Sequence, residues 1–205
     1  MRVLPYGTEA VLVEVDSLGE VLGLTADLET TPAKGVIDVV PAARTVMIWF
    51  DSEVTDVQRI RRDVLARNVE AQVLPEGEEI KVPIDYGGDD LSYVAEVTGL
   101  GESEIVERHQ RPTYVVAFIG MAPGFYFLSG GDPLLRVPRR QSPRTSVPRG
   151  AVGLAGEFTG IYPRKGPGGW QIIGHTRSEL WDTDRHPAAL LTPGTRLRFI
   201  ADLLT

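Results

Sequence analysis

Glycine and proline recur so closely between Arg136 and Thr176 that this stretch cannot form a long helix. Proline fixes its own φ angle and drives the preceding residue into extended geometry. The first half of the stretch, in which prolines alternate with arginines, therefore predicts a stiff extended loop. In the second half, glycines interrupt an apolar run. Such glycines stand at the bulges and tight turns of a β barrel, or where backbone N–H groups approach a ligand.

The second half of the chain repeats short apolar runs between turn signals, at intervals of roughly 8–12 residues. This spacing predicts a closed or nearly closed β barrel. The expected strands lie at residues 80–84, 113–120, 151–155, 158–162, 171–174 and 195–201. Two short helices, one after Asp90 and one at residues 102–109, form an insert between the first two strands. A turn at residues 121–126 is expected to expose Phe125 and Tyr126, which could contact a partner.

The first part of the chain has a different order of elements. Strands are predicted at residues 11–15, 36–40, 45–50 and 69–74. Helices are predicted at residues 17–28 and from residue 55 to residue 68, with Ser17 and Thr55 as their N-caps. The resulting order, βαββαβ, is that of a ferredoxin-like domain. Because residues 75–78 are rich in turn formers, we expect an α+β chain with a ferredoxin-like domain at 1–77 and a β-barrel domain at 78–205.

The segment from Pro133 to Ser178 is basic, although the chain as a whole is acidic. It holds eight Lys or Arg residues against one acid, a charge of +7, whereas the whole chain carries −7. This asymmetry favours a place where an anion or an acidic partner is held. Guanidinium groups suit carboxylate and phosphate, so Arg139, Arg140 and Arg144 are predicted to bind the substrate. Tying loops to backbone carbonyls is the alternative role for each.

Composition excludes several classes of protein. A pI near 5.0 argues against a general nucleic-acid binder. No apolar run approaches the roughly 20 residues that span a bilayer, so no membrane partner is expected. Cysteine is absent, which removes disulfides, thiolate nucleophiles and cysteine metal sites. The N-terminus lacks a signal-peptide pattern, so a cytoplasmic protein is expected. The glycines at 166–169 lack the Gly-Lys-Ser/Thr ending of a phosphate-binding loop.

The three histidines, His109, His175 and His186, are widely separated, so no metal site is expected. His109 closes the second short helix beside Ile105 and Val106. It could transfer protons in catalysis, or it could be a hydrogen-bonded histidine of the core. His175 ends a strand and is a weaker candidate.

Four further residues are candidates because of their neighbours. Tyr86, with Gly87 and Gly88 next to it, is predicted to line the same pocket as the arginines, with Tyr86 in a catalytic role. Trp170 follows two glycines and could stack on a ligand, although a buried aromatic is the commoner outcome.

An ordered series of short motifs runs through nearly the whole chain. The motifs stand at residues 36–42, 82–88, 119–125, 138–140, 143–144, 147–148, 153–156, 159–163 and 167–170. The series resembles the family of the B subunit of 5-oxoprolinase, which also appears under the labels allophanate hydrolase subunit 1 and Kip-type inhibitor of a sporulation histidine kinase. Small departures from the family's usual pattern stand at Met121, Tyr126 and Glu157.

The resemblance implies a cyclophilin-like barrel for the second domain and adds Thr159 to the candidate substrate-binding residues. It also implies a chain that is inactive alone. Such a chain would work with a second cyclophilin-like subunit and a third component to open the lactam 5-oxoproline to glutamate. ATP, with Mg, would be used by the complex rather than bound by this chain alone.

Three alternatives remain at this point. One is a non-catalytic interaction module that inhibits a sensor histidine kinase. Another is a subunit of an allophanate- or urea-metabolising enzyme of the carboxyltransferase type, which would need a biotin carrier domain elsewhere. The third and weakest is prolyl isomerase activity, because sharing a fold with an enzyme does not imply sharing its function.

Overall fold

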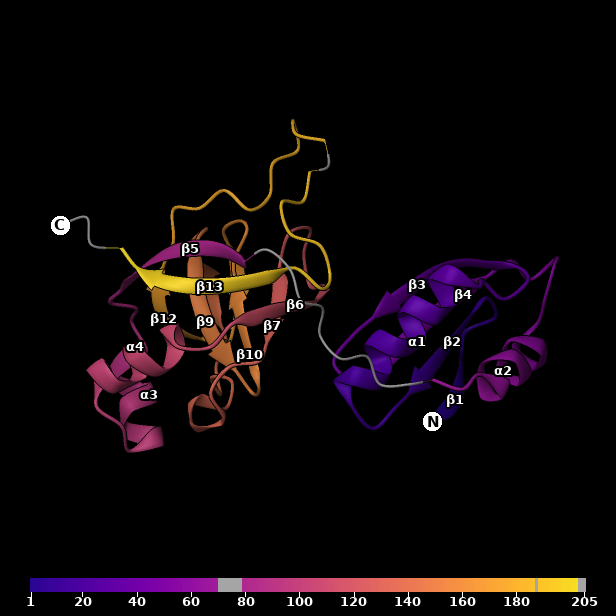
Figure 1. Cartoon of the computed structure of the whole chain (residues 1–205), viewed down its shortest axis with the longest axis horizontal. Coiled ribbons are helices and arrows are strands. Elements are labelled where there is room, and N and C mark those ends of the chain that lie inside the picture. The colour runs from indigo at the N-terminus through magenta and orange to yellow at the C-terminus, as the bar shows by residue number, and fades with distance from the viewer. Residues whose placement is uncertain (70–78, 187, 203–205) are drawn as a thin grey trace. The chain divides into compact units, whose positions relative to one another are not determined.

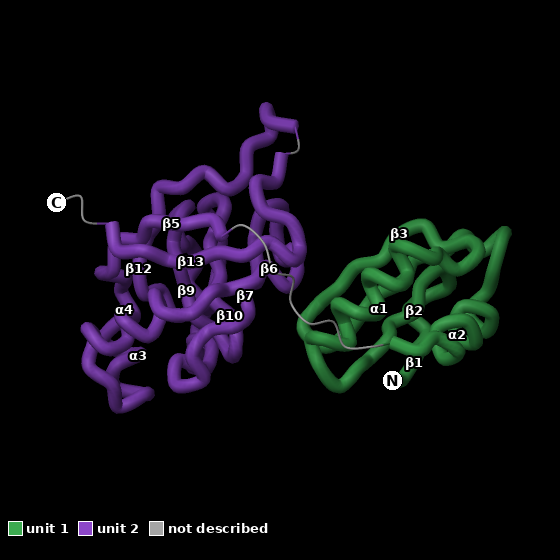
Figure 2. Tube along the Cα trace, viewed as in Figure 1, with its two compact units in different colours: residues 1–74 green, residues 75–205 purple. Residues whose placement is uncertain are grey.

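The computed structural model describes residues 1–69, 79–186 and 188–202 of the chain. The chain divides into two compact units, residues 1–74 and 75–205, which Figure 2 shows in different colours. Each unit has its own core, because every cluster of buried apolar side chains among the described residues draws its members from one unit alone. The boundary predicted between residues 77 and 78 lies outside the described residues and stays a prediction.

Unit 1 is a four-stranded antiparallel sheet with two helices (Figure 1). Its strands are β1 (Arg2–Tyr6), β2 (Ala10–Glu14), β3 (Val36–Pro41) and β4 (Thr45–Phe50), in the order β1-β2-β4-β3. Helix α1 (Leu18–Thr30) packs against β3 and β4, and α2 (Val57–Ala66) packs against β1 and β2. Alternate strand residues point to the helices, as the period of a strand requires. Val11, Val13, Val46 and Ile48 are fully buried there.

Polar residues fix where the two helices of unit 1 begin. Ser17 caps α1 as predicted, because its hydroxyl accepts the backbone N–H of Glu20 at 3.2 Å. The cap of α2 is Asp56, whose carboxylate accepts the backbone N–H of Arg59 at 2.9 Å. The prediction of Thr55 as the cap was therefore wrong by one residue. An aspartate at this position also complements the positive end of the helix dipole.

The ferredoxin-like description of unit 1 is not confirmed. Its described elements run β-β-α-β-β-α, because β1 precedes the strand at which the predicted order began. Strand β1 was not predicted because Pro5, which lies within it, is not typical of a strand. A strand at the edge of a sheet tolerates the missing N–H of a proline, and β1 is an edge strand. The strand predicted at residues 69–74 lies outside the described residues, except for Val69, which packs against the core.

Unit 2 contains a closed barrel of seven strands, which confirms the predicted barrel. Its strands are β5 (Glu79–Tyr86), β6 (Tyr114–Ile119), β7 (Tyr126–Ser129), β9 (Ala151–Ala155), β10 (Phe158–Ile161), β12 (Gln171–His175) and β13 (Arg196–Ala201). Around the barrel they follow the order β10-β7-β6-β13-β5-β12-β9. Neighbours are antiparallel except β5 and β13, which are parallel. All but β7 occupy predicted segments.

Strand β7 begins in the segment predicted to be an exposed turn. A turn does precede it, with Gly124 at φ 76° and Met121 at φ 65°. The exposure predicted for the aromatic residues was wrong, since Phe125 and Tyr126 are fully buried. The Phe125 ring lies edge-on to Trp170 with 5.3 Å between ring centroids. The Tyr126 hydroxyl donates to the carbonyl of Leu180 at 2.9 Å.

The remaining elements of unit 2 surround the barrel. Helices α3 (Leu91–Thr98) and α4 (Glu102–Gln110) form the predicted insert between β5 and β6, and they pack on β12 and β13 (Figure 1). A short 3₁₀ turn, η1 (Pro133–Leu135), precedes the arginines. Strands β8 (Arg144–Val147) and β11 (Gly166–Gly168) pair as a separate two-stranded ribbon. The arginine segment is thus extended, as predicted, and its end joins this ribbon.

Candidate functional site

Asp90 ties the arginine loop, defined here as residues 138–144, to the barrel. Its side chain is only 3% exposed. Arg140 donates one hydrogen bond to the carboxylate at 2.6 Å, and Arg144 donates two, at 2.7 and 2.9 Å. The backbone N–H of Ile172 in β12 is a fourth donor, at 2.7 Å. Two of the three arginines predicted to bind substrate therefore bind a buried carboxylate of the chain itself.

The surroundings of Asp90 keep it ionised. Burial alone would raise its pKa, but the hydrogen bonds from Arg144 and Ile172 and the charges of Arg144 and Arg140 outweigh burial, so the pKa lies below its ordinary value. Asp90 stands just before α3, yet its carboxylate makes no capping hydrogen bond to that helix. The third arginine, Arg139, is exposed and has no acid partner among the residues that the structure describes.

His109 lies inside the barrel with no exposed surface. Its Nδ1 is 2.8 Å from the Tyr86 hydroxyl, and its Nε2 is 3.3 Å from the Thr159 hydroxyl. The ring of Phe199 lies against the imidazole, with 4.5 Å between centroids. Burial lowers the pKa of His109 to about 3 and raises that of Tyr86. The structure therefore brings together three predicted site residues, but the imidazole at the centre of the network has no surface that a substrate could contact.

Two other predicted residues have structural surroundings. Trp170 is 2% exposed and packs among aromatic rings of the barrel, including those of Phe125 and Phe127. Gly88 lies so close to β12 that a Cβ atom would stand 2.4 Å from the carbonyl oxygen of Ile172. Its N–H donates to the carbonyl of Ile173 at 3.2 Å. Only glycine allows this close approach of two backbones. Gly87, by contrast, has open space beside it.

A first cavity of about 210 Å³, called here the Gly87 cavity, lies between the end of β5 and strand β8. Gly87, Gly88 and Arg144 line it, so the structure brings these three predicted residues to one place. Its other polar walls are the exposed carboxylates of Asp85 and Asp89 and the imidazole of His175. Its apolar floor comes from Val147, Ala151 and Ile172.

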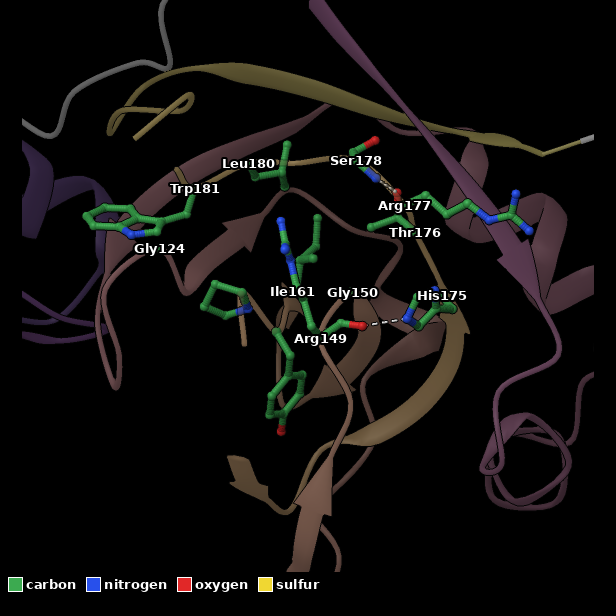
Figure 3. A pocket seen from close by; sticks show the side chains of 12 residues that line it. Gly124, Arg149, Gly150, Ile161, His175, Thr176, Arg177, Ser178, Leu180 and Trp181 are labelled. Atoms are coloured by element: carbon green, nitrogen blue, oxygen red, sulfur yellow. Dashed lines mark hydrogen bonds between the residues drawn. The ribbon is translucent and has the colours of Figure 1, made fainter. Parts of the chain in front are cut away.

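A second cavity of about 200 Å³, the Arg149 cavity, also has His175 in its wall (Figure 3). In that view the Arg149 side chain rises between Ile161 and Leu180, while the guanidinium of Arg177 extends away from it. Arg149 pairs with Glu179 at 2.6 Å, and both side chains are largely exposed. Such a surface pair contributes little stability, so Arg149 is accessible to another anion.

His175 is the residue that both cavities share. Its Nε2 donates to the backbone carbonyl of Arg149, as the dashed line in Figure 3 marks. A carbonyl oxygen can only accept, so the proton of the neutral ring is on Nε2 and the lone pair is on Nδ1. The sequence analysis gave His175 a weaker place than His109. Asp85 was not predicted as a site residue, because only the pairing of β5 with β12 places it opposite His175.

The described residues contain no group of three or more His, Asp or Glu side chains placed to hold a metal ion. No helix in the described part of the chain is long and apolar enough to cross a bilayer. The two cavities beside His175 are smaller than the roughly 300–1,000 Å³ of pockets for larger ligands, and neither has a glycine-lysine phosphate loop.

Residues 1–191 match the family model described as carboxyltransferase domain, subdomain C and D. The B subunit of 5-oxoprolinase from Escherichia coli O157:H7 is 46% identical over 129 residues, which are 62% of this chain and 59% of that protein. The B subunit of 5-oxoprolinase from Bacillus subtilis is 36% identical over 200 residues, 89% of this chain and 82% of that protein. The crystal structure of TTHA0988 superposes with a TM-score of 0.78 at 33% identity, over 95% of this chain and 40% of the other. The match thus spans less than two thirds of the E. coli relative and of TTHA0988.

Proposed function

This chain belongs to the carboxyltransferase domain family, subdomain C and D, among the relatives named as B subunits of 5-oxoprolinase, and we propose that it is one subunit of an ATP-dependent 5-oxoprolinase. In this proposal the complex opens 5-oxoproline to glutamate, and the chain is inactive alone. The observation that carries the proposal is the identity of 36–46% to proteins of that name. A subunit name implies a complex of several proteins. The proposed partners are a second cyclophilin-like subunit and a third component.

The Gly87 cavity supports a small, polar substrate. Its volume of about 210 Å³ suits a molecule much smaller than a nucleotide. The lactam ring has an apolar edge that the floor at Val147 and Ile172 can contact. Its N–H can donate to a carboxylate such as Asp85 or Asp89, and its carboxylate carries the charge that Arg144 attracts.

The three predicted arginines have different roles in this proposal from the substrate binding that the sequence suggested for all of them. Arg144 faces both the cavity and Asp90, so it can attract the substrate carboxylate while the loop stays fixed. Arg140 holds the loop through Asp90 and does not line either cavity beside His175. Arg139 is an exposed residue of the arginine loop, where it can contact a partner subunit. Because the glycines at 166–169 lack the Gly-Lys-Ser/Thr ending of a phosphate-binding loop, we assign nucleotide and Mg binding to another subunit.

The test is a reconstitution of the complex. This chain would be purified with the second barrel subunit and the third component, and phosphate and glutamate release would be followed with and without 5-oxoproline. We expect turnover that requires all three proteins and the lactam. The matched control is 2-pyrrolidinone, the same ring without the carboxylate, which should support far less turnover. A stable complex that releases no phosphate in response to 5-oxoproline would contradict the proposed activity.

A further inference from the structure

The three histidines of this chain differ in what their rings can reach. Both nitrogens of His109 face hydroxyl groups inside the barrel, and the ring has no exposed surface. His186 is exposed and lines neither of the two cavities. His175 alone of the three combines an exposed ring with a place in the wall of both cavities.

The backbone at residues 149 and 150 leaves room for the His175 ring and holds it by a hydrogen bond. Gly150 has φ 81°, a conformation that favours glycine. A Cβ atom on Gly150 would stand 2.8 Å from Cε1 of His175 and 2.2 Å from the carbonyl oxygen of Thr176. The carbonyl of Gly150 accepts the N–H of Thr176 at 2.8 Å, and the carbonyl of Arg149 accepts Nε2–H of His175. The ring is therefore held by fixed backbone groups, not by a mobile side chain.

Holding Nε2 in this way sets the chemistry of the other nitrogen. The neutral ring carries its proton on Nε2, so Nδ1 presents a lone pair and no described residue is hydrogen-bonded to it. Asp85 stands opposite His175 in the β5–β12 pair and lines the same cavity. Side chains that are directly opposite in antiparallel strands lie on one face, about 5 Å apart at Cβ. A substrate in the Gly87 cavity thus has an acceptor carboxylate and an imidazole lone pair on the same wall.

We propose that His175, not His109, is the proton-transfer residue of this subunit. The inference rests on the proposed function and deepens it. Nδ1 accepts a proton from water while the water oxygen bonds to the lactam carbonyl carbon. The carbon–nitrogen bond of the ring then breaks, and the same proton goes to the departing nitrogen.

The first test replaces His175 with glutamine in the reconstituted complex. The amide N–H of His175→Gln can still donate to the carbonyl of Arg149, so the local structure is kept while the base is lost. We expect kcat to fall by about 10²–10⁴-fold with KM within threefold. The fall of kcat/KM on the acid side of the wild-type pH profile should be absent in the variant. The matched control, His186→Gln, should keep the wild-type kcat and pH profile.

Other charged groups line the two cavities with His175, and their titration must be separated from its role in the pH profile. They are Asp85, Asp89, Arg144, Arg149 and Arg177, together with Glu179, which pairs with Arg149. The profile of Asp85→Asn identifies the contribution of the carboxylate that is directly opposite. An acid limb that persists in His175→Gln and disappears in Asp85→Asn would overturn the inference, because the carboxylate would then be the base.

A second measurement needs no turnover. Diethyl pyrocarbonate acylates accessible imidazole nitrogens, and mass spectrometry locates the product. We expect His175 and His186 to react in the complex, His109 to stay unmodified, and saturating 5-oxoproline to protect His175 alone. If the wild-type complex turns over 5-oxoproline and His175→Gln has the same kcat, the role of His175 is refuted and the proposed function stands. A wild-type complex with no lactam-dependent turnover and no protection refutes both.

Discussion

At the scale of single residues, His109 shows how the barrel uses a titratable group without exposing it. The imidazole bridges the hydroxyls of Tyr86 and Thr159 and packs on Phe199, so it joins three strands and α4. A neutral imidazole satisfies both hydroxyl neighbours, whereas a charged ring in this place would be poorly solvated. The network therefore stabilises the barrel only while His109 is neutral.

This placement predicts how stability depends on pH. Unfolded, His109 takes up a proton near its ordinary pKa of roughly 6.5, whereas the folded value is about 3. Between these values the unfolded state binds more protons, so the free energy of unfolding falls as pH falls, by about 1.4 kcal/mol per pH unit. Between pH 7 and pH 5 the wild type should lose about 2 kcal/mol from this group.

The measurement is urea denaturation at the two pH values, followed by tryptophan fluorescence, to which the buried Trp170 contributes. His109→Gln keeps hydrogen-bonding capacity but removes the titration, so its loss of stability between pH 7 and pH 5 should be about 2 kcal/mol smaller than that of the wild type. His186→Gln should behave as the wild type does. Equal pH dependence in His109→Gln and the wild type would contradict the assignment.

At the scale of elements, Asp90 is the contact that holds the arginine loop against α3 and β12. Asp90→Asn keeps the shape of the side chain but removes the buried carboxylate that Arg140 and Arg144 share, and leaves Arg144 only the exposed Asp89 at 3.6 Å. Removing one partner of such a network lowers the free energy of unfolding by about 3 kcal/mol. We expect urea denaturation to show this loss, and trypsin to cleave faster after the arginines of the loop. At low urea concentration the faster cleavage should be confined to the loop.

Asp89→Asn is the matched control for the loop. Asp89 is the neighbouring acid, but its side chain is 82% exposed and lies 3.6 Å from Arg144. An exposed pair of this kind contributes less than about 1 kcal/mol. If the two variants lost similar amounts of unfolding free energy, net charge and not the buried carboxylate would hold the loop in place.

The elements also show which features a sequence can predict. Six barrel strands follow from local patterns of apolar residues, so they were found. Strand β1 was missed because Pro5 breaks its pattern, and β7 was missed because it starts inside a Pro-Gly turn. The partners of Asp90 lie 50 and 54 residues further along the chain. Only the fold brings them together, so an arginine segment that looked free for a ligand holds a buried acid instead.

The candidate site was predictable only in part, for the same reason. Gly87, Gly88 and Arg144 were singled out by local composition, and they do line one cavity. The position of His175 depends on a backbone carbonyl in another segment and on the missing side chain of Gly150. Neither dependence leaves a local signal, whereas His109 drew notice because it closes a short amphipathic helix.

At the scale of the whole molecule, the two units have separate cores, so damage to one should stay within it. Ile48 is fully buried in the core of unit 1, and Ile173 is fully buried in unit 2. Replacing either with alanine should cost its own unit about 2–5 kcal/mol. Because no described core cluster contains residues of both units, the other unit should keep its stability.

Hydrogen exchange measured by mass spectrometry distinguishes the units peptide by peptide. Ile48→Ala should speed exchange in peptides from β2, β4 and α1 and leave those from β9 and β12 unchanged, while Ile173→Ala should do the reverse. Each variant is thus the control for the other. Faster exchange in both units from either substitution would show that they unfold as one body. The cavities beside His175 would then depend on unit 1 for their shape, and substitutions in its sheet would change lactam turnover as strongly as those in the barrel.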